Sequence, residues 1–253
     1  MRSGHTNLEH RTLRRRDLMV ALGGLGAGAI WGGSRATRAL ARLSAGSQEQ
    51  AAAAAACVLT PEVTEGPYYI ANHLTRRNIT DGRPGLPLVL DLAIVTASSC
   101  SPIAGADVEL WHTDAGGVYS GYSGSTPPSG VGGHATPDNS KRFLRGHQKS
   151  DANGKVRFIT IYPGWYRGRT PHIHLKVHVG GQVVHTGQLF FSDRVSDTVY
   201  RTSSYEAHGQ PDTTNAADSI YHAAGGGSAR LHLTKRTGRG KGYRGTITVG
   251  VRT

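Results

Sequence analysis

Several segments of the chain have the apolar content, length and turn spacing of β-strands, and the first two alternate apolar and polar residues with a period of two. These segments are residues 86–95, 106–112, 155–161, 172–179, 182–191 and 245–251. Asp-Ala-Asn-Gly at 151–154 is a turn sequence directly ahead of one of them. The pattern predicts an all-β fold, arranged as a sandwich of antiparallel sheets.

Two long segments interrupt this pattern. Residues 113–150 are rich in Gly, Ser, Thr and Pro and are too long for an ordinary hairpin loop. Long loops on a rigid sheet are typically functional or disordered, and we expect His134 and His147 within this loop to face solvent. Residues 193–229 predict a second irregular stretch, with a short helical turn near 216–222.

Composition excludes several classes of protein. With 37% hydrophobic and 18% charged residues among 253, the chain is not a coiled coil, a collagen or a disordered acidic protein. It holds four Phe and two Met against ten Tyr and thirteen His. The core must therefore come from Val, Leu, Ile and Ala, and many side chains remain that can bind a metal.

The formal net charge of +12 is concentrated at the two ends of the chain. Residues 1–42 carry +6 and residues 230–253 carry +7, which leaves −1 for residues 43–229. A nucleic-acid-binding domain would carry its basic surface on the folded part, so we expect no nucleic-acid partner. We interpret the basic segment 235–241 as a solvated turn.

The N-terminal segment has the features of an export signal. Arg14-Arg15-Arg16 precedes a weakly apolar, glycine-rich run at 20–31, and Ala-Leu-Ala at 39–41 is a possible small-x-small cleavage site. The pattern resembles a twin-arginine signal. The apolar run is too short and too rich in glycine for a stable membrane span.

We therefore divide the chain into a signal peptide at 1–41, an Ala-rich linker at 42–56 and a β-sandwich domain at 57–253. The domain is expected to be exported to the periplasm, the cell wall or the medium. Behind an export signal, the two cysteines Cys57 and Cys100 predict one disulfide. It would join the start of the domain to the end of its first long strand.

His172-Ile173-His174 lies on a predicted strand, where side chains alternate between the two faces. Both imidazoles therefore point to one face and Ile173 to the other. Their Cα atoms are ~6.5–7 Å apart, a span that lets both rings bind one ion at ~2 Å. A polar face with hydrogen-bonded histidines, or a zinc or copper site, would show the same pattern, so the surrounding residues have to decide.

Four segments carry further chemistry, in the order TPEVTEGPYY at 60–69, DVELWHTDAGGVY at 107–119, PGWYRGRTPHIH at 163–174 and QLFF at 188–191. Together they resemble the intradiol ring-cleavage dioxygenases, the relatives of protocatechuate 3,4-dioxygenase and catechol 1,2-dioxygenase. One such motif would be weak, but four in the family's order are specific. Only five residues separate Tyr166 from His172, fewer than is usual in that family, which alters the expected wall of the pocket.

The resemblance implies a β-sandwich of immunoglobulin-like or prealbumin-like type and a non-haem Fe(III) cofactor. The implied iron ligands are Tyr119, Tyr166, His172 and His174. Phenolate oxygen is a hard anionic ligand and Fe(III) is a hard cation, so two tyrosines suit this metal. Tyr122 lies three residues after Tyr119 and is an alternative axial ligand.

The resemblance also implies the roles of other residues. Arg169 and Gln188 would bind the substrate and act in catalysis, and Tyr68 would line the pocket. Tyr119 would leave the iron when a catechol-type substrate binds, and would accept a proton. With O2 as the second substrate, the ring would open between its two hydroxyls to a muconate-type diacid. The alternative role for Arg169 is a surface ion pair or a backbone brace.

Two functions from different classes are consistent with these residues. The first is an exported dioxygenase acting on catechols. The second is an exported, non-catalytic β-sandwich binding module with a vestigial metal site. The presence of both tyrosines, both histidines, Arg169 and Gln188 favours the enzyme, because a binding module does not need the complete set. The oligomeric state is left open.

Replacing Arg15 and Arg16 by Lys tests the export signal. The twin-arginine route depends on the arginine pair, so we expect the precursor to accumulate in the cytoplasm. Cell fractionation followed by immunoblotting measures the mature form outside the cytoplasm. A normal amount of mature protein there would contradict this route.

Overall fold

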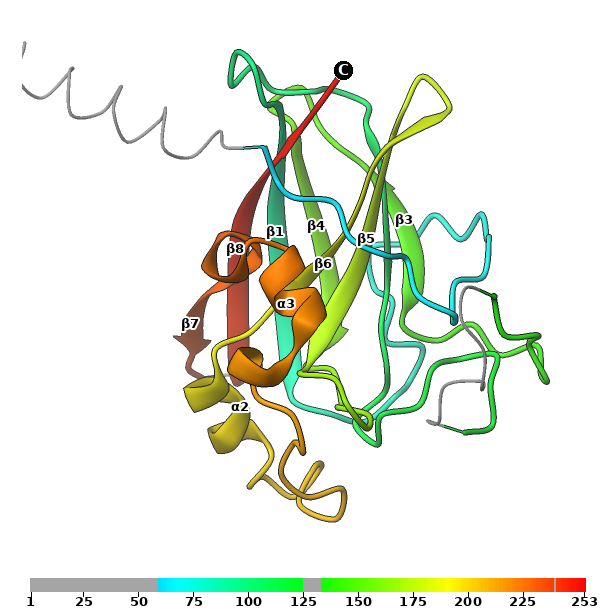
Figure 1. The fold of residues 1–253 in the computed structure, drawn as a ribbon, viewed down its shortest axis with the longest axis vertical. Helices are drawn as coiled ribbons and strands as arrows, with labels where there is room; N and C mark the ends of the chain where they lie inside the picture. The colour runs from blue at the N-terminus through cyan, green and yellow to red at the C-terminus, as the bar shows by residue number, and fades with distance from the viewer. Residues whose placement is uncertain (1–58, 125–132, 239) are drawn as a thin grey trace, which may run out of the picture. The chain divides into compact units, whose positions relative to one another are not determined.

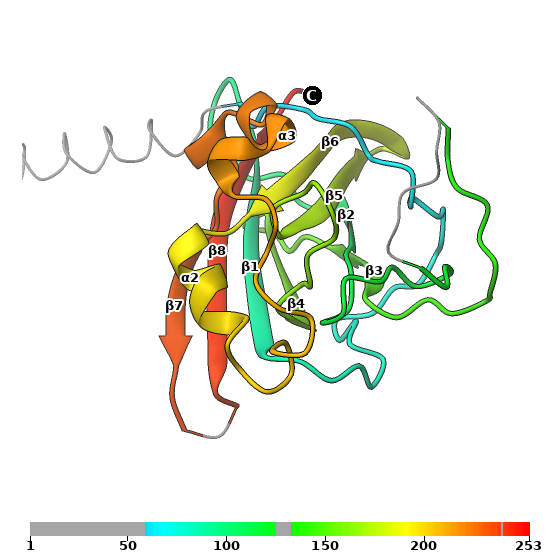
Figure 2. The same cartoon turned by 60° about the horizontal axis from the view of Figure 1, so that its bottom comes forward.

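The computed structural model describes residues 59–124, 133–238 and 240–253, which belong to one compact unit, Glu49–Thr253. The strands of this part are β1 (Pro87–Thr96), β2 (Asp107–Trp111), β3 (Arg145–Lys149), β4 (Lys155–Ile161), β5 (His172–Val179), β6 (Gln182–Phe190), β7 (His232–Arg236) and β8 (Gly242–Val251). They form two four-stranded sheets, with the orders β4-β1-β8-β7 and β3-β2-β5-β6 (Figures 1 and 2).

One hydrophobic core joins the two sheets. Leu88, Leu90 and Leu92 of β1 are buried and alternate with more exposed residues, so this strand buries one face. They belong to the same cluster of packed side chains as Ile173 and Leu175 of β5 in the other sheet. Each fully buried side chain of this kind contributes about 1.5–3 kcal/mol relative to exposure. Burial of the two inner faces therefore holds the sheets together.

The predicted strands are present. Those at 155–161 and 172–179 have the predicted bounds, and the others differ by a few residues at their ends. The all-β class is confirmed, while the immunoglobulin-like or prealbumin-like type stays a prediction. The expectation of purely antiparallel sheets is wrong at one place, because β1 and β8 pair in parallel from Leu88 opposite Tyr243 onward. Alternation within a strand does not encode the direction of its partner.

The strands β3 and β7 are not predicted by the sequence pattern. They read Arg-Gly-His-Gln-Lys and His-Leu-Thr-Lys-Arg, and neither has a clear apolar alternation. β3 lies within the segment 113–150 that we interpreted as a loop, and it pairs with β2. β7 includes the start of the basic segment 235–241 and pairs with β8. Backbone hydrogen bonds to a neighbouring strand, rather than side-chain pattern, define both.

The described helices all fall within 193–229. They are α2 (Asp193–Val199), the 3-10 turn η1 (Asn215–Ala217), α3 (Ser219–Ala223) and the 3-10 turn η2 (Gly226–Ala229). η1 and α3 confirm the predicted helical turn, whereas α2 is not predicted. Tyr221 of α3 packs on Phe190 at the end of β6, which holds this segment beside the second sheet. None of the helices in the described ranges is long and apolar enough to cross a membrane.

Cys100 follows β1 and is disulfide-bonded. Cys57 lies outside the described residues, so its pairing with Cys100 stays a prediction. The signal peptide at 1–41 and the linker at 42–56 also lie outside the described residues. Within the loop between β2 and β3, His134 is exposed, as expected.

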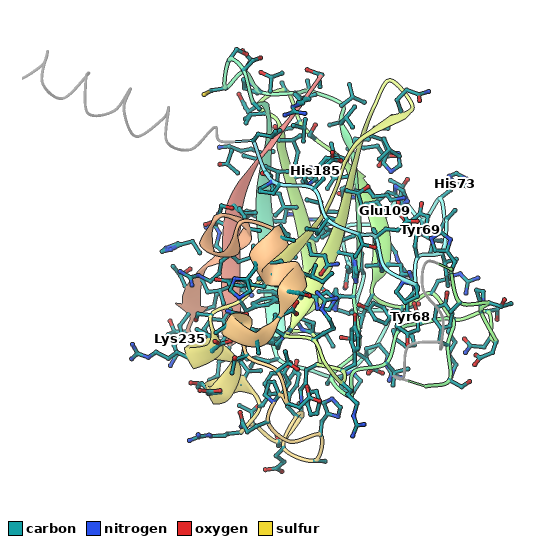
Figure 3. All side chains as sticks on the ribbon, viewed as in Figure 1. Tyr68, Tyr69, His73, Glu109, His185 and Lys235 are labelled. Atoms are coloured by element: carbon teal, nitrogen blue, oxygen red, sulfur yellow. The ribbon has the colours of Figure 1, made fainter. Side chains whose placement is uncertain are left out.

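His147 is buried, which contradicts the expectation that it faces solvent. It lies on β3 directly opposite Glu109 of β2. Its Nε2 is 3.4 Å from Glu109 Oε1, and its Nδ1 is 3.2 Å from Asp107 Oδ1. His178 Nε2 is 3.6 Å from the other carboxylate oxygen of Glu109. Tyr69, which lies beside Glu109 in Figure 3, donates its hydroxyl to the same carboxylate at 3.3 Å. The buried carboxylate of Glu109 is thus a shared partner of these side chains, which explains why His147 is buried.

This environment makes the stability of the protein depend on pH through His147. Burial disfavours its charged form, but the nearby carboxylates of Glu109 and Asp107 outweigh burial and raise its pKa above 6.5. Protonated His147 therefore stabilises the folded protein. This stabilisation is complete at pH values below the unfolded-state pKa of about 6.5, and it is lost as the pH rises through the higher pKa of the folded state.

We therefore expect the free energy of unfolding of the wild type to exceed that of His147→Gln most below about pH 6.5. The difference should shrink as the pH rises above that value. Urea unfolding of both proteins across this range measures it. A difference that is the same at every pH would show that His147 contributes by packing alone.

Candidate active site

Four buried side chains converge at one end of the second sheet. His172 and His174 project from β5 onto its outer face, while Ile173 between them enters the core. Tyr119 comes from the loop after β2, and Tyr166 from the loop between β4 and β5. None of the four is more than 5% exposed. The structure thus brings together all four residues that the sequence singles out as iron ligands.

The polar atoms of these four side chains lie close to one another. Tyr119 Oη is 2.9 Å from His174 Nε2 and 3.3 Å from His172 Nε2. The two Nε2 atoms are 3.1 Å apart, and Tyr166 Oη is 3.3 Å from His172 Nε2. Ligand atoms at ~2.0–2.2 Å from a common ion are ~3–3.5 Å from each other. The cluster therefore has the spacing of a ligand set around one metal ion.

Neighbouring groups orient both imidazole rings. His172 Nδ1 donates to the carbonyl of Thr170 at 2.7 Å, which leaves the lone pair of Nε2 directed at the cluster. His174 is stacked on Trp111, with ring centroids 4.8 Å apart and planes at 9°. Gly66 lets the segment 60–69 approach, since a Cβ there would lie 3.2 Å from His174 Cε1.

Burial sets the charge of the four groups. It holds the pKa values of His172 and His174 well below 6.5, so both rings are neutral and can bind a metal. It also raises the pKa values of Tyr119 and Tyr166, and the positive charge of Arg169 opposes this in both. The phenolate forms therefore need a stronger positive charge close by, which a metal cation supplies.

Two phenol oxygens and two imidazole nitrogens make up the donor set, and this chemistry fits Fe(III), which prefers hard anionic oxygen. Among the residues that the structure describes, no group of three or more His, Cys, Asp or Glu side chains could hold a metal ion. A zinc or copper site on the two histidines alone would leave the two tyrosines without a role.

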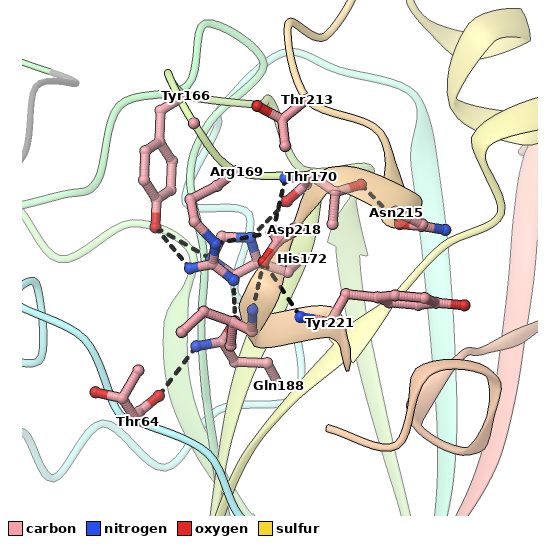
Figure 4. Close-up of polar contacts among 12 residues, drawn as sticks. Thr64, Tyr166, Arg169, Thr170, His172, Gln188, Thr213, Asn215, Asp218 and Tyr221 are labelled. Atoms are coloured by element: carbon pink, nitrogen blue, oxygen red, sulfur yellow. Dashed lines mark hydrogen bonds and ion pairs between the residues drawn. The ribbon is translucent and has the colours of Figure 1, made fainter. Parts of the chain in front are cut away.

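Arg169 and Gln188 lie beside this cluster (Figure 4). Arg169 Nη1 donates to Tyr166 Oη at 3.3 Å, and its Nη2 donates to Gln188 Oε1 at 2.6 Å. Gln188 in turn donates to the carbonyl of Thr64 at 3.0 Å. Arg169 also forms an ion pair with Asp218 at 2.9 Å. Arg169 thus forms an ion pair, as the alternative role predicted, and it also contacts Tyr166 of the cluster.

Tyr68 and Tyr122 take different positions next to the cluster. Tyr68 stacks on Tyr119 with centroids 4.7 Å apart and meets Tyr166 edge-on at 6.2 Å. Its hydroxyl is buried, with no hydrogen-bond partner among the described residues. Tyr122 instead donates its hydroxyl to the carbonyl of Ala135 at 3.1 Å. Tyr119, and not Tyr122, therefore reaches the histidines.

Two further side chains that could bind a metal, His112 and Tyr162, have partners outside the cluster. His112 bonds through Nδ1 to the Thr113 carbonyl and through Nε2 to Thr160 Oγ1, each at 2.7 Å. Tyr162 packs in the core, and its hydroxyl pairs with Ser196 Oγ at 2.9 Å.

Sequence reasoning misses two residues that shape the site. Trp111 ends β2 and covers His174, and Asp218 precedes α3 and binds Arg169. Asp218 has a signal in the sequence, since an Asp before a short helical segment is a typical N-cap. Its contact with an arginine 49 positions away has none.

Part of the chain matches a known protein family. Residues 64–218 match the family described as Dioxygenase. Over 112 residues the chain is 34% identical to catechol 1,2-dioxygenase 1 of Acinetobacter lwoffii, covering 42% of this chain and 32% of that enzyme. The match thus spans about a third of the length of this curated relative.

Solved structures agree with this match. An intradiol ring-cleavage dioxygenase from Tetranychus urticae is 34% identical with a TM-score of 0.71, covering 78% of this chain and 95% of that one. The dioxygenase domain of a carbohydrate-binding fusion from Streptomyces sp. SirexAA-E is 27% identical with a TM-score of 0.55, covering 77% and 99%.

The match over 64–218 places the chain among the dioxygenases, and the two-sheet fold and the buried Tyr-His cluster agree with it. Within that class it belongs to the intradiol ring-cleavage dioxygenase family, as the match over 64–218 and the similarity to the Tetranychus urticae protein show. Members of this family are non-haem iron enzymes.

Substitution of Tyr119 and Tyr122 by Phe tests which tyrosine binds the metal. Tyr119→Phe removes an oxygen from the cluster, and we expect the affinity for iron to fall by at least ~10-fold, since even residues that only support ligands cost ~10–100-fold. Tyr122→Phe should stay within ~2-fold of wild type, because its hydroxyl binds a carbonyl elsewhere. Competition with a chelator measures both. The reverse order of effects would identify Tyr122 as the ligand.

Proposed function

We propose that this chain is an exported Fe(III) dioxygenase that opens catechol-type rings between their two hydroxyls. The observation that carries the proposal is the convergence of Tyr119, Tyr166, His172 and His174 within hydrogen-bonding distance in a buried site. Family membership supports it, and the catechol 1,2-dioxygenase name of the curated relative points to the substrate class. The twin-arginine pattern supports export.

In this proposal the four clustered residues hold the iron. When bound there, Fe(III) would draw electron density from a chelated catecholate, so that a hydroxyl-bearing ring carbon could react with O2. A hard cation also stabilises the phenolate forms that burial otherwise disfavours.

The two tyrosines have different surroundings, and this suggests different roles. Tyr166 Oη accepts a hydrogen bond from Arg169, which stabilises its anionic form. Tyr119 Oη lies beside the two imidazole nitrogens, and among the described residues no arginine donates a hydrogen bond to it. We therefore assign Tyr166 as the permanent phenolate. Tyr119 is the group that gives way to the substrate and accepts one of its hydroxyl protons.

Arg169 is placed to stabilise negative charge on the substrate. Its guanidinium touches Tyr166 of the cluster and is only 16% exposed, so its charge is weakly screened by water. A fixed positive charge beside the ring stabilises the anionic form through which the ring becomes reactive. Gln188 accepts a hydrogen bond from Arg169 and lies next to it beside the cluster.

Aromatic rings form the wall nearest to Tyr119. Tyr68 lies against both Tyr119 and Tyr166, and its free hydroxyl is one group that could bind a substrate oxygen. A planar catechol ring can stack on such a wall. These contacts support the assignment of Tyr68, Arg169 and Gln188 as substrate-binding residues.

The product formed from catechol and O2 tests the proposal. Cleavage between the hydroxyls gives a cis,cis-muconate-type diacid, which mass spectrometry and ultraviolet absorbance identify. We expect this diacid from the iron-loaded wild type. Tyr166→Phe should lower the turnover rate by at least ~10²-fold, more than the ~10–100-fold typical of supporting residues.

The colour of the protein is a second measurement in the same experiment. Phenolate bound to Fe(III) absorbs visible light, and the band should shift when catechol is added. Catechol binding without turnover in the iron-loaded wild type would support the non-catalytic binding module instead. A yellow semialdehyde product, or a colourless protein with one equivalent of zinc, would contradict the proposed chemistry.

A further inference from the structure

The short loop between Tyr166 and His172 is tied to a distant segment of the chain, residues 212–218. The backbone N–H of Gly168 donates to Asp212 Oδ1 at 3.1 Å. The hydroxyl of Thr170 donates to Asn215 Oδ1 at 2.8 Å. Asp218 binds both Arg169 and the backbone of Thr170. Three consecutive loop residues therefore depend on contacts from one outside segment, and Figure 4 shows the contacts of Arg169 and Thr170.

Asp218 is the centre of this attachment. Its side chain is 1% exposed. Oδ1 accepts the backbone N–H groups of Ile220 at 2.8 Å and Tyr221 at 3.2 Å, which caps α3. Oδ2 accepts Arg169 Nε at 2.9 Å and the backbone N–H of Thr170 at 3.0 Å. Two donors on each oxygen satisfy the carboxylate fully.

The contact at Nε determines the direction of the whole guanidinium. This group is planar, and its donors form a rigid fork. With Nε held by Asp218, Nη1 is directed at Tyr166 Oη and Nη2 at Gln188 Oε1. Without that contact, the side chain would have freedom to turn its fork away from the cluster.

We propose that Asp218 is the positioning residue that aims Arg169 at the substrate side of the Tyr-His cluster. The inference rests on the proposed function, in which Arg169 stabilises negative charge on the bound ring. Asp218 acts through Arg169, and its described hydrogen bonds reach none of the four clustered residues. The cap of α3 thereby connects the segment 212–218 to the chemistry of the site.

Asp218→Ser separates the two roles of this residue. Serine is a good N-cap and keeps an acceptor for the first turn of α3, but it is neutral and too short to hold Arg169. We expect kcat for catechol to fall ~10–100-fold, with little change in bound iron. The variant loses an interaction that stabilises the reacting ring, and such a loss lowers kcat more than it changes KM.

Ser192→Ala is the matched control. Ser192 caps α2 by accepting from the backbone N–H of Val195, and none of its described hydrogen bonds involves Arg169 or Asp218. Its loss should lower the melting temperature and leave kcat unchanged. If Asp218 were only a helix cap, Asp218→Ser would behave in the same way, and an unchanged kcat per iron-loaded enzyme would overturn the proposal.

A double-mutant cycle with Arg169→Lys tests whether the effect passes through the arginine. Lysine keeps the charge and lacks the planar fork, so Asp218→Ser should cost less than ~3-fold in kcat in that background. An equal cost in both backgrounds would overturn the proposal.

Asp218→Asn is the second variant if the serine variant does not fold, because its amide can offer an acceptor on one side only. Wild-type kcat in Asp218→Asn would then count against the proposal.

A further measurement does not depend on turnover. Binding of 4-nitrocatechol to the iron-loaded protein, followed by its visible spectrum, should weaken at least ~3-fold in Asp218→Ser and remain unchanged in Ser192→Ala. Failure of the wild type to cleave catechol would reject the proposed function. Cleavage by the wild type, with no change in either kcat or nitrocatechol binding in Asp218→Ser, would reject this inference alone.

Discussion

Strand β5 has to bury both of its faces, and the rest of the structure depends on this constraint. Its inner face supplies Ile173 and Leu175 to the core between the sheets. Its outer face carries His172 and His174, which are almost as deeply buried. A buried polar atom without a partner costs about 1–3 kcal/mol. The loops that cover the outer face therefore have to bring polar groups, and they bring Tyr119 and Tyr166.

The same requirement organises charged side chains along the rest of this face. Glu109 is buried next to His147, Lys176 contacts Glu65, and Arg169 contacts Asp218. Each of these three pairs places a charge that the fold removes from water beside an opposite charge, since an unpaired buried charge is strongly destabilising. These pairs also join the 60–69 and 212–218 segments to the sheet. The side chains around the cluster are therefore held in place before a substrate arrives, as an active site requires.

The strands show where local pattern is informative. β4 and β5 match their predicted bounds because apolar residues with the right period have to face the core. β3 has no such pattern, since Arg145 and His147 are buried by polar partners rather than by apolar contacts. The parallel pairing of β1 with β8 joins segments about 150 positions apart, and alternation within each strand is the same for either direction.

The sequence by itself determined the family and three of the clustered residues, Tyr166, His172 and His174, with either Tyr119 or Tyr122 as the fourth. It also pointed to Arg169, Gln188 and Tyr68. It could do so because a period of two puts His172 and His174 on one face, and because the remaining residues stand in ordered motifs. Only the tertiary structure decided that Tyr119 rather than Tyr122 reaches the histidines, that His147 is buried and that Asp218 holds Arg169. Those outcomes depend on contacts between residues far apart in the chain, and a local pattern of polar and apolar positions carries no information about such contacts.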